Sequence, residues 1–500
     1  MQGMMASGDT TTVQHHPVTI HTEVIVVGNG PSAISLSNML AGNRPYYKGT
    51  PLSNEFLTRR LKENMDITLL EQDLGPLCES LEGRSNNPVA LLFDSLFHPD
   101  ADWGADGISA LEWRQEGIHE IPHVVLGKTK PGGTWQKIDG AMQTISQNSW
   151  MELPSVPFKE WLANQNRKSP TRKYLIGRAT IADVKEYYSD YVKTQGLEKY
   201  FRDFHTVTSV HRVFHSHSNV DSDSGEVEPC SHNVRRNHTH FWEVRGYQTI
   251  VDEQGEAVAR QEFCYVSPHV VLATGAYDIP NRLGVEGENL PCVVHCLGEF
   301  EKLLSQCDVS ANADPVLVVG AGLSAADCIL MAMEANIPVI HVFRRKPTDQ
   351  SLIFSKLPKA MYPEYHIIHS LMKGKEVREL YKPLPRHSIT ELRHNKVLVK
   401  CRRSGTVTWF DVSAVAVMIG SRADLSFLPR EGRHLGVVPD WPIDSKHNVI
   451  DVDAYSYQSV HEPQMFAMGP LVGDNFVRFG IGGALGIASH LNRCQKMEYM

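Results

Sequence analysis

The sequence predicts an α/β fold with two similar β-α-β units, the second inserted into the first. Two observations support this prediction. The apolar run VIVV at residues 24–27 and the apolar run VLVV at 316–319 each lead directly into a turn of the pattern Gly-x-Gly-x-x-Ala. Two further apolar runs that end in glycine, at 270–275 and 414–420, follow along the chain. Continuous apolar runs of this length are typical of parallel strands buried on both faces.

Composition bounds the class of protein. A chain of 500 residues is too long for one hydrophobic core, so two or three domains are expected. The net charge of −8 argues against a nucleic-acid-binding protein. No run approaches about 18 apolar residues and the N-terminus has no basic region before an apolar run, so neither a transmembrane segment nor a secretory signal is expected. The nine scattered cysteines form no CxxC pair, which favours a reducing compartment and an intracellular, cytoplasmic protein.

The first unit continues from its glycine turn into a helix, predicted over 32–40. The run DITLLEQ at 66–72 is predicted to be the second strand of the unit, and the residues between are an insertion or an extra helix. Residues 76–157 are irregular and rich in Gly, Pro, Asn and Trp, which is typical of long functional loops. Helical periodicity returns at 181–197, and residues 205–262 are predicted to form paired strands around a His-rich loop.

The second unit has its own second strand, predicted over 338–347, and the segment 465–491 closes the molecule. This order of elements divides the chain into four parts. They are a flexible N-terminus at 1–20, a first domain at 21–285 with active-site loops at 76–157, an inserted domain at 286–413, and a C-terminal part of the first domain at 414–500.

Each glycine turn matches the pattern that holds the pyrophosphate of a dinucleotide. The first glycine permits the tight bend, the second lets the backbone approach the phosphates, and the third small residue lets helix and strand pack closely. The N–H groups at the start of the following helix then face the phosphates. The candidate residues are Gly28, Gly30, Pro31, Ser32 and Ala33 in the first unit and Gly320, Gly322, Ser324 and Ala325 in the second. A tight turn without a ligand is the alternative, but it requires the same coincidence twice.

The ends of the second strands predict which nucleotide each unit binds. Glu71 ends the predicted strand of the first unit, farther from Gly28 than is usual, and a carboxylate there accepts hydrogen bonds from the ribose of FAD. Arg344 and Arg345 end the second strand of the second unit, where two guanidinium groups match the 2′-phosphate of NADPH. A solvated basic turn is the alternative for the arginines. We therefore predict two Rossmann-like dinucleotide-binding domains, the NADPH-binding domain inserted into the FAD-binding domain.

This layout resembles that of flavoproteins with two dinucleotide domains, and several motifs narrow the resemblance. GGTW at 132–135, SQNSW at 146–150 and VVHCLGEFEK at 293–302 look like the class B monooxygenases, which are the flavin-containing monooxygenases and the lysine and ornithine N-hydroxylases. The longer segments GRSNNPVALLFDSLFHPDADWG, MYPEYH and GPLVGDNFVRFG are similar to the oxidative stress-induced growth inhibitor family, along the chain from about residue 22 to 491. The resemblance implies an FAD- and NADPH-dependent monooxygenase linked to the control of growth and cell death.

The resemblance also implies a reaction and a set of site residues. NADPH reduces the flavin, O2 adds to form a flavin C4a-hydroperoxide, and its distal oxygen passes to a nucleophile, so the site needs neutral amides more than acids or bases. Asn148, with Gln147 beside it, lies where flavin-containing monooxygenases have an active-site asparagine, although a loop amide that caps backbone groups is the alternative. Other residues expected around the flavin are Trp135, Gln143, Thr274, Gly275, Gly469 and Asp474. Disulfide reductases have Gly-Asp where this chain has Gly469-Pro470, so the role of Asp474 stays open.

Other chemistries have weaker support in the sequence. Cys292 and Cys296 are the nearest approach to a redox pair, but burial as small apolar groups is favoured. The histidines between 205 and 240 match no compact zinc ligand set, so no metal site is expected. There is no GxSxG nucleophile elbow.

Three functions remain open at this point. The first is an NADPH-dependent flavin monooxygenase that uses O2 and a small-molecule or protein nucleophile of unknown identity. The second is a flavoprotein fold kept as a signalling or scaffold module with protein partners. The third is an NADPH oxidase-like producer of hydrogen peroxide, which differs from the first only in the fate of the activated oxygen.

Overall fold

The computed structural model describes residues 17–499 except 106, 139, 141, 169–176, 215–239, 253–255 and 306–313. Its first domain is built on a five-stranded parallel sheet with the order β21-β10-β2-β5-β6. The strands are β21 (Met465–Ala467), β10 (His269–Leu272), β2 (Val24–Val27), β5 (His123–Leu126) and β6 (Phe201–Arg202). Every residue of β2, β5 and β10 is buried, which explains why these strands are continuous apolar runs.

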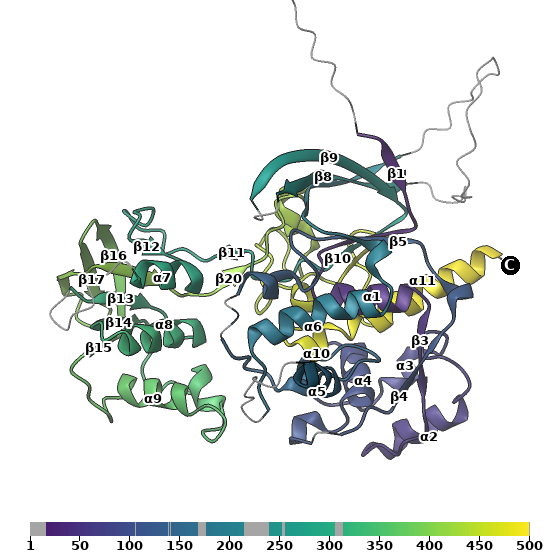
Figure 1. The fold of residues 1–500 in the computed structure, drawn as a ribbon, viewed down its shortest axis with the longest axis horizontal. Coiled ribbons are helices and arrows are strands. Elements are labelled where there is room, and N and C mark those ends of the chain that lie inside the picture. The colour runs from purple at the N-terminus through teal and green to yellow at the C-terminus, as the bar shows by residue number, and fades with distance from the viewer. Residues whose placement is uncertain are drawn as a thin grey trace, which may run out of the picture.

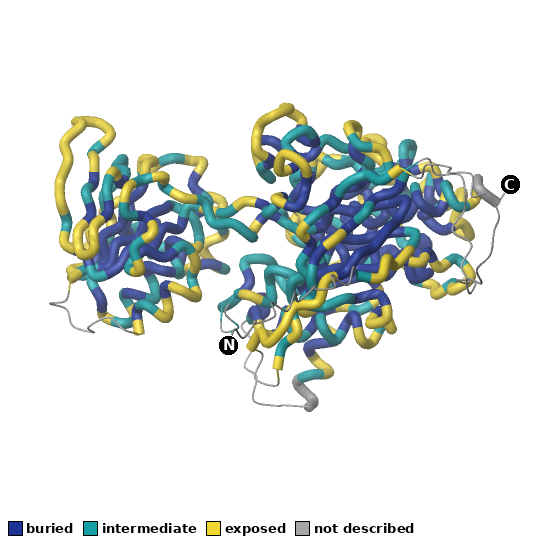
Figure 2. The backbone as a smooth tube through the Cα atoms, turned by 90° about the horizontal axis from the view of Figure 1, so that it is seen from above, coloured by how far each residue is buried: buried dark blue, intermediate teal, exposed yellow. Residues whose placement is uncertain are grey.

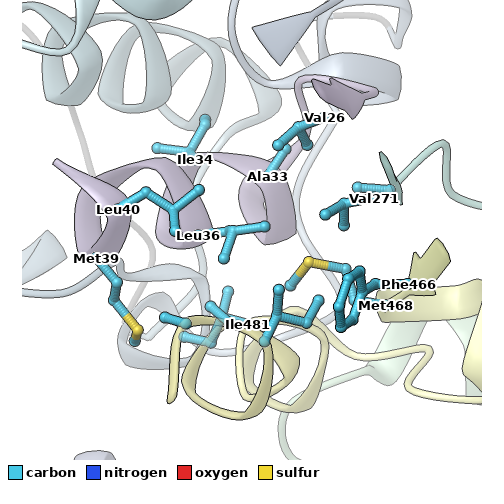
Figure 3. Packing of buried hydrophobic residues seen from close by; sticks show 14 of the residues in the cluster. Val26, Ala33, Ile34, Leu36, Met39, Leu40, Val271, Phe466, Met468 and Ile481 are labelled. Carbon is cyan, nitrogen blue, oxygen red and sulfur yellow. The ribbon is translucent and has the colours of Figure 1, made fainter. Parts of the chain in front are cut away.

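Two further layers enclose the parallel sheet. Helix α1 (Pro31–Leu40) packs against α11 (Gly483–Tyr499), and Figure 3 shows Leu36 of α1 pointing toward Ile481, just before α11. The second layer is the sheet β1-β9-β8-β7, which contacts β2, β5 and β10. Its strands are β1 (Thr19–His21), β9 (Ala257–Ser267), β8 (Phe241–Val251) and β7 (His205–Val213). Figure 1 shows this sheet above the parallel sheet and the two helices below it.

The residues between α1 and β5 form an insertion with its own secondary structure. The strands β3 (Asn43–Tyr47) and β4 (Leu111–Gln115) pair antiparallel. The helices of the insertion are α2 (Glu55–Glu63), α3 (Leu74–Leu77), α4 (Pro88–Phe97), η1 (Ala101–Trp103) and η2 (Gly117–His119). The segment after β5 adds η3 (Gly133–Lys137), η4 (Asn148–Met151), α5 (Phe158–Lys168), α6 (Ile181–Thr194) and η5 (Glu198–Tyr200).

The second domain repeats the pattern of the first around the parallel sheet β12-β19-β13-β14-β15. Its strands are β12 (Val293–Val294), β19 (Ala414–Val417), β13 (Val316–Val319), β14 (Val339–Phe343) and β15 (Tyr381–Pro385). The helices are α7 (Leu297–Leu304), α8 (Leu323–Glu334), η6 (Ile353–Lys356) and α9 (Pro363–Met372). A three-stranded sheet of β16 (His387–Arg393), β17 (Lys396–Cys401) and β18 (Val407–Asp411) packs on the parallel sheet.

A narrow two-stranded ribbon joins the domains. It consists of β11 (Ile279–Pro280) and β20 (Ser421–Arg422), which pair antiparallel, and Figures 1 and 2 show the second domain set apart from the first beyond this ribbon. The remaining elements belong to the first domain and are η7 (Pro429–Leu435), η8 (Gly469–Val472) and α10 (Val477–Gly480). The hydrophobic cores of the two domains share no residue among those described.

Most of the predicted elements are confirmed, but three expectations are wrong. Residues 66–72 form turns, and β5 takes the place of the second strand, because the chain between α1 and β5 forms an insertion that contains the antiparallel pair β3–β4. The boundary expected at residue 413 is one strand early, because β19 pairs with β13 in the inserted domain. Within the expected flexible N-terminus, Thr19–His21 form β1, paired with β9. Of the described helices, none is both long and apolar enough to cross a membrane.

Candidate functional site

The first glycine turn has the backbone that the sequence pattern predicts. Gly28 has φ +110°, and a Cβ there would lie 2.3 Å from the carbonyl oxygen of Ala273, so no larger residue fits. At Gly30, in contrast, no heavy atom of the described chain lies within 4 Å of the Cβ position. Gly30 is also the N-cap of α1, which receives no side-chain capping bond in the described chain, so its first N–H groups are open to a phosphate.

Three other segments come together around this turn. Gly133 of the GGTW motif lies against Gly30, since a Cβ at Gly133 would stand 3.1 Å from the Gly30 Cα. Thr274 follows β10 beside Gly28. Ser32 meets the C-terminal segment, because a Cβ at Gly469 would lie 2.8 Å from the Ser32 Oγ.

Tyr188 of α6 connects the GGTW motif to the loop that carries Asn148. Its ring lies against Gly132, and its hydroxyl donates a hydrogen bond of 3.1 Å to the carbonyl oxygen of Met151. Trp135 is half-buried and packs on the core of the first domain. The loop is also held from the other side, because the Asn148 amide N–H donates to Gly177 (3.0 Å) and Gln143 bridges to Thr180. The SQNSW loop is therefore fixed close to the first glycine turn.

Two buried polar atoms at this site have no hydrogen-bond partner among the described residues. They are the side-chain oxygen Oδ1 of Asn148 and the hydroxyl Oγ1 of Thr274. A buried polar group without a partner is costly, so atoms of this kind often mark the contacts of a bound molecule. Together with the open space at Gly30, they fit a dinucleotide whose phosphates lie at α1 and whose ring system extends toward Asn148. The half-buried side chain of Gln147 lies next to Asn148 at the start of η4.

The second glycine turn repeats the geometry of the first. Gly320 has φ +137° and a Cβ there would lie 2.2 Å from the Met418 carbonyl oxygen, whereas the Cβ position of Gly322 has no described heavy atom within 4 Å. Below the turn, the buried His341 donates from Nε2 to the Gly320 carbonyl oxygen (2.6 Å) and accepts at Nδ1 from the Tyr381 hydroxyl (2.7 Å). Burial lowers the pKa of His341 to about 4, so this imidazole is neutral at physiological pH. Sequence reasoning missed it because a histidine inside an apolar strand gives no local signal.

The arginines that follow β14 are exposed, as a phosphate site requires. Arg345 donates to the Ser351 hydroxyl (2.6 Å), while Arg344 has no hydrogen-bond or ion-pair partner among the described residues. Arg344 and Arg345 are the first and second residues after β14, which pairs with β13, the strand that leads into the second turn.

Comparing the two units residue by residue shows that the first unit lacks a carboxylate at the end of its second strand. Gly28 donates to Leu126 (2.8 Å) as Gly320 donates to Val342 (3.0 Å), so Lys128 in the first unit corresponds to Arg344 in the second. Lys128 pairs with Asp424 (3.0 Å). No carboxylate ends the second strand of the first unit.

Glu71 therefore does not close this strand, contrary to the prediction. It lies in the turn after α2, where its carboxylate contacts Arg44 (2.7 Å) and Lys496 (2.9 Å). These contacts tie the insertion to α11, and they leave the predicted ribose contact without its structural basis.

Asp474 is almost fully buried and holds the insertion against the C-terminal segment. Its carboxyl accepts hydrogen bonds from the Ser85 hydroxyl (2.6 Å) and the Asn87 amide (2.8 Å), just before α4. Its own amide N–H donates to Gly469 (3.2 Å), so the side chain sits behind the segment that touches Ser32. Burial raises the pKa of Asp474 to about 7.

A buried ionic cluster supports the SQNSW loop from below. Arg478 of α10 pairs with Asp94 of α4 (2.9 Å) and with Asp102, and its guanidinium lies 4.5 Å from the centre of the Trp150 ring. Burial by itself would lower the pKa of His98, but the hydrogen bonds and negative charges of Asp94 and Glu152 outweigh this effect, so the pKa is raised. The imidazole also contacts the Ser149 carbonyl oxygen (2.9 Å). Sequence reasoning missed this cluster because Arg478 and Glu152 lie far along the chain from Asp94, His98 and Asp102.

The described cysteines and histidines provide no other centre. All described cysteines are free, and burial raises the pKa of both Cys292 and Cys296, which disfavours a reactive thiolate. Within the described ranges no cluster of His, Cys, Asp and Glu is arranged to hold a metal ion. Most of the His-rich loop, residues 215–239, lies outside the described residues.

Comparison with known proteins supports the flavoprotein fold. The family model of the pyridine nucleotide-disulphide oxidoreductases matches residues 242–437. The chain is 42% identical to oxidative stress-induced growth inhibitor 2 of Homo sapiens, over 98% of this chain and 97% of that protein. Among solved structures, bacillithiol disulfide reductase Bdr of Staphylococcus aureus has a TM-score of 0.55 at 14% identity, covering 95% of this chain and 99% of that one. L-lysine 6-monooxygenase of Pseudomonas syringae has a TM-score of 0.52 at 16% identity, with the same coverage.

Proposed function

Because the chain belongs to the oxidative stress-induced growth inhibitor family, we propose that it is an NADPH-dependent flavin monooxygenase. FAD binds at the first glycine turn and NADPH at the second. The substrate is a nucleophile that accepts one oxygen atom from O2. A lysine monooxygenase has a related fold, so the fold of this chain is compatible with this reaction class.

The observation that carries the proposal is the buried side-chain oxygen of Asn148, which has no hydrogen-bond partner among the described residues. Its loop is connected through Tyr188 to the GGTW motif, which lies against Gly30. A disulfide reductase of the CxxC type needs a redox thiol pair beside the flavin. The nearest approach to such a pair in the sequence, Cys292 and Cys296, lies just before and just after β12 of the second domain. An oxygen-transferring site requires neutral hydrogen-bonding groups that do not protonate the activated oxygen prematurely. An asparagine amide meets this requirement, since it both donates and accepts hydrogen bonds without a charge.

The chain supplies binding and orientation for the two cofactors. The N–H groups at the start of α1 and the open space at Gly30 accommodate the FAD pyrophosphate. The side-chain oxygens of Thr274 and Asn148, which have no partner among the described residues, are available to other parts of FAD. At the second turn, Gly322 and the start of α8 accommodate the NADPH pyrophosphate, and Arg344 and Arg345 face its 2′-phosphate. When bound, FAD accepts a hydride from NADPH and activates O2.

The direct test is the visible spectrum of the purified protein with FAD, followed by NADPH addition in air while NADPH loss and hydrogen peroxide are both recorded. We expect a flavin band that bleaches and then recovers. Asn148→Ala should keep the flavin and its reduction but release hydrogen peroxide about tenfold faster per flavin, because the activated oxygen loses its amide partner.

Two variants serve as controls for this test. Asn395→Ala removes an exposed amide in the second domain and should behave as the native protein. Gly30→Val should lose the flavin while the protein stays folded, because no described heavy atom lies within 4 Å of the Cβ position. A colourless native protein that neither binds FAD nor oxidises NADPH would refute the proposal and favour the scaffold module. If the native protein and Asn148→Ala both consume all of the NADPH and release equal amounts of hydrogen peroxide, the result would favour the NADPH oxidase-like alternative.

A further inference from the structure

One set of side chains joins the second domain directly to the SQNSW loop. Arg178 lies just before α6 in the first domain and is 8% exposed. Its Nε donates to the carbonyl oxygen of Thr144 (2.7 Å), and its Nη1 donates to the Glu364 carboxylate (2.8 Å) at the start of α9 in the second domain. One guanidinium thus bridges the loop and the other domain, with the planar fork geometry that suits two acceptors at once.

Neighbouring groups strengthen the same connection. The Tyr362 hydroxyl of the second domain donates to the carbonyl oxygen of Ile145, and the Arg178 guanidinium lies 4.9 Å from the centre of the Tyr362 ring. The Ile145 side chain packs against the hydrophobic core of the second domain, although its backbone belongs to the loop of the first. We call Thr144, Ile145, Arg178, Tyr362 and Glu364 the interdomain clasp.

The clasp connects the two candidate cofactor sites through a short series of contacts. On one side, Glu364 is followed by Tyr365, whose hydroxyl donates to Asp327 (2.9 Å) of α8, the helix that starts at the second glycine turn. On the other side, Thr144 and Ile145 lead within the same loop to Asn148, whose N–H is bound by Gly177 beside Arg178. The ribbon β11–β20 is the narrow covalent connection between the domains, so the clasp is what fixes their arrangement at the loop.

We propose that Arg178 is a positioning residue that couples the position of Asn148 to the position of the second domain against the first. When the clasp is closed, the nucleotide-binding domain and the amide of Asn148 are held in one arrangement. When it is open, both are released together. The effect on turnover depends on the proposed function, whereas the mechanical connection does not.

The test begins with hydrogen exchange on the protein without added cofactors. The backbone N–H groups of Thr144 and Asn148 donate to the carbonyl oxygens of Ala179 and Gly177. Their exchange rates therefore report how firmly the SQNSW loop is held in place. Arg178→Gln should speed exchange of the peptides that cover 142–153 and 357–366 by roughly tenfold, because both ends of the clasp are released. Tyr362→Phe, which removes a single bond, should change the same peptides less.

A matched control and a turnover assay complete the test. Arg378→Gln removes an exposed arginine paired with Glu376 in the second domain, and it should leave these peptides unchanged. With FAD and NADPH, Arg178→Gln should raise the KM for NADPH about five- to tenfold and increase peroxide per NADPH, while Arg178→Lys, which reaches only one of the two acceptors, should fall between.

The possible outcomes distinguish a failure of the interdomain clasp from a failure of the proposed function. Unchanged exchange at 142–153 in Arg178→Gln would overturn the clasp, whatever the enzyme does. Faster exchange in that variant, in a protein that oxidises no NADPH, would retain the mechanical connection and remove the proposed function. Normal KM and normal peroxide yield in an active Arg178→Gln enzyme would refute the role of the clasp in turnover.

Discussion

Single residues of this chain carry information that their neighbours in sequence do not reveal. Gly28 and Gly320 are required because their positive-φ backbone lies against a carbonyl oxygen at the end of a neighbouring strand, β10 or β19, and a pattern search finds them. His341 and Asp474, in contrast, are identified only by the groups that surround them. The buried imidazole is kept neutral beneath the second turn, and burial raises the pKa of the carboxyl behind the first turn to about 7.

The raised pKa of Asp474 predicts a pH-dependent stability. The folded protein keeps this proton up to about pH 7, whereas the unfolded chain releases it near pH 4. Between these values the folded state binds more protons, so the contribution of Asp474 to the free energy of unfolding decreases as pH rises from about 4 to about 7. Relative to Asp474→Asn, the cofactor-free native protein should lose on the order of 2 kcal/mol between pH 5 and pH 8.

Thermal unfolding at both pH values measures this difference. The variant keeps an acceptor and a neutral side chain in the place of the carboxyl, so it serves as the reference for all other titrating groups. If the native protein and Asp474→Asn change in parallel with pH, Asp474 is ionised in the folded protein and the predicted shift is wrong.

At the scale of elements, α6 organises the segment that leads away from the SQNSW loop. Three tyrosines of this helix are buried, and their hydroxyls bind backbone groups of residues 151–156. Thr180 and Asp183 form a capping box at the start of the helix. The segment 151–156 has little regular structure of its own, so the helix supplies its missing hydrogen bonds.

The three tyrosines should differ in their contribution to stability. The Tyr187 hydroxyl accepts from the Leu153 N–H (2.7 Å) and donates to the Val156 carbonyl oxygen (2.6 Å), whereas the Tyr191 hydroxyl makes one bond, to Pro154 (2.8 Å). Tyr187→Phe therefore leaves two buried backbone groups unpaired and should lower the free energy of unfolding by about 2–4 kcal/mol, against about 1–2 kcal/mol for Tyr191→Phe. Urea unfolding of the two variants tests the order, and equal losses would contradict it.

At the scale of the whole molecule, two separately cored domains are joined by a ribbon and a clasp. Pro280 and Ser421 are directly paired in the ribbon. Replacing residues 281–420 with a short Gly-Ser linker should therefore leave a first domain that folds and unfolds cooperatively. The deletion of residues 286–413, the boundary expected from the sequence, should aggregate, because it leaves the apolar strand β19 without its partner β13.

Size-exclusion chromatography and thermal melts distinguish these two deletions. Cooperative melting of the first and aggregation of the second would show that the domain boundary lies at the ribbon. Similar behaviour of both proteins would mean that β19 does not depend on the inserted domain.

The sequence by itself determined the two glycine turns, the strands β2, β10, β13 and β14, and the family. These features are local: a buried parallel strand is a continuous apolar run, and a pyrophosphate turn needs glycine at fixed spacing. Only the tertiary structure decided which strand lies beside β2. The segments 66–72 and 123–126 each contain an apolar run, and the choice between them depends on the insertion between α1 and β5 that contains the pair β3–β4.

The same reason explains the parts of the site that the sequence did not reveal. The bonds from Arg178 to Glu364, from Arg478 to Asp94 and from Asp474 to Ser85 each join residues more than 180 positions apart in the chain. Such contacts are selected by the packing of whole elements, and no local pattern encodes them. The sequence determined the local geometry of the two glycine turns, and the tertiary structure decided how the two candidate sites are held together.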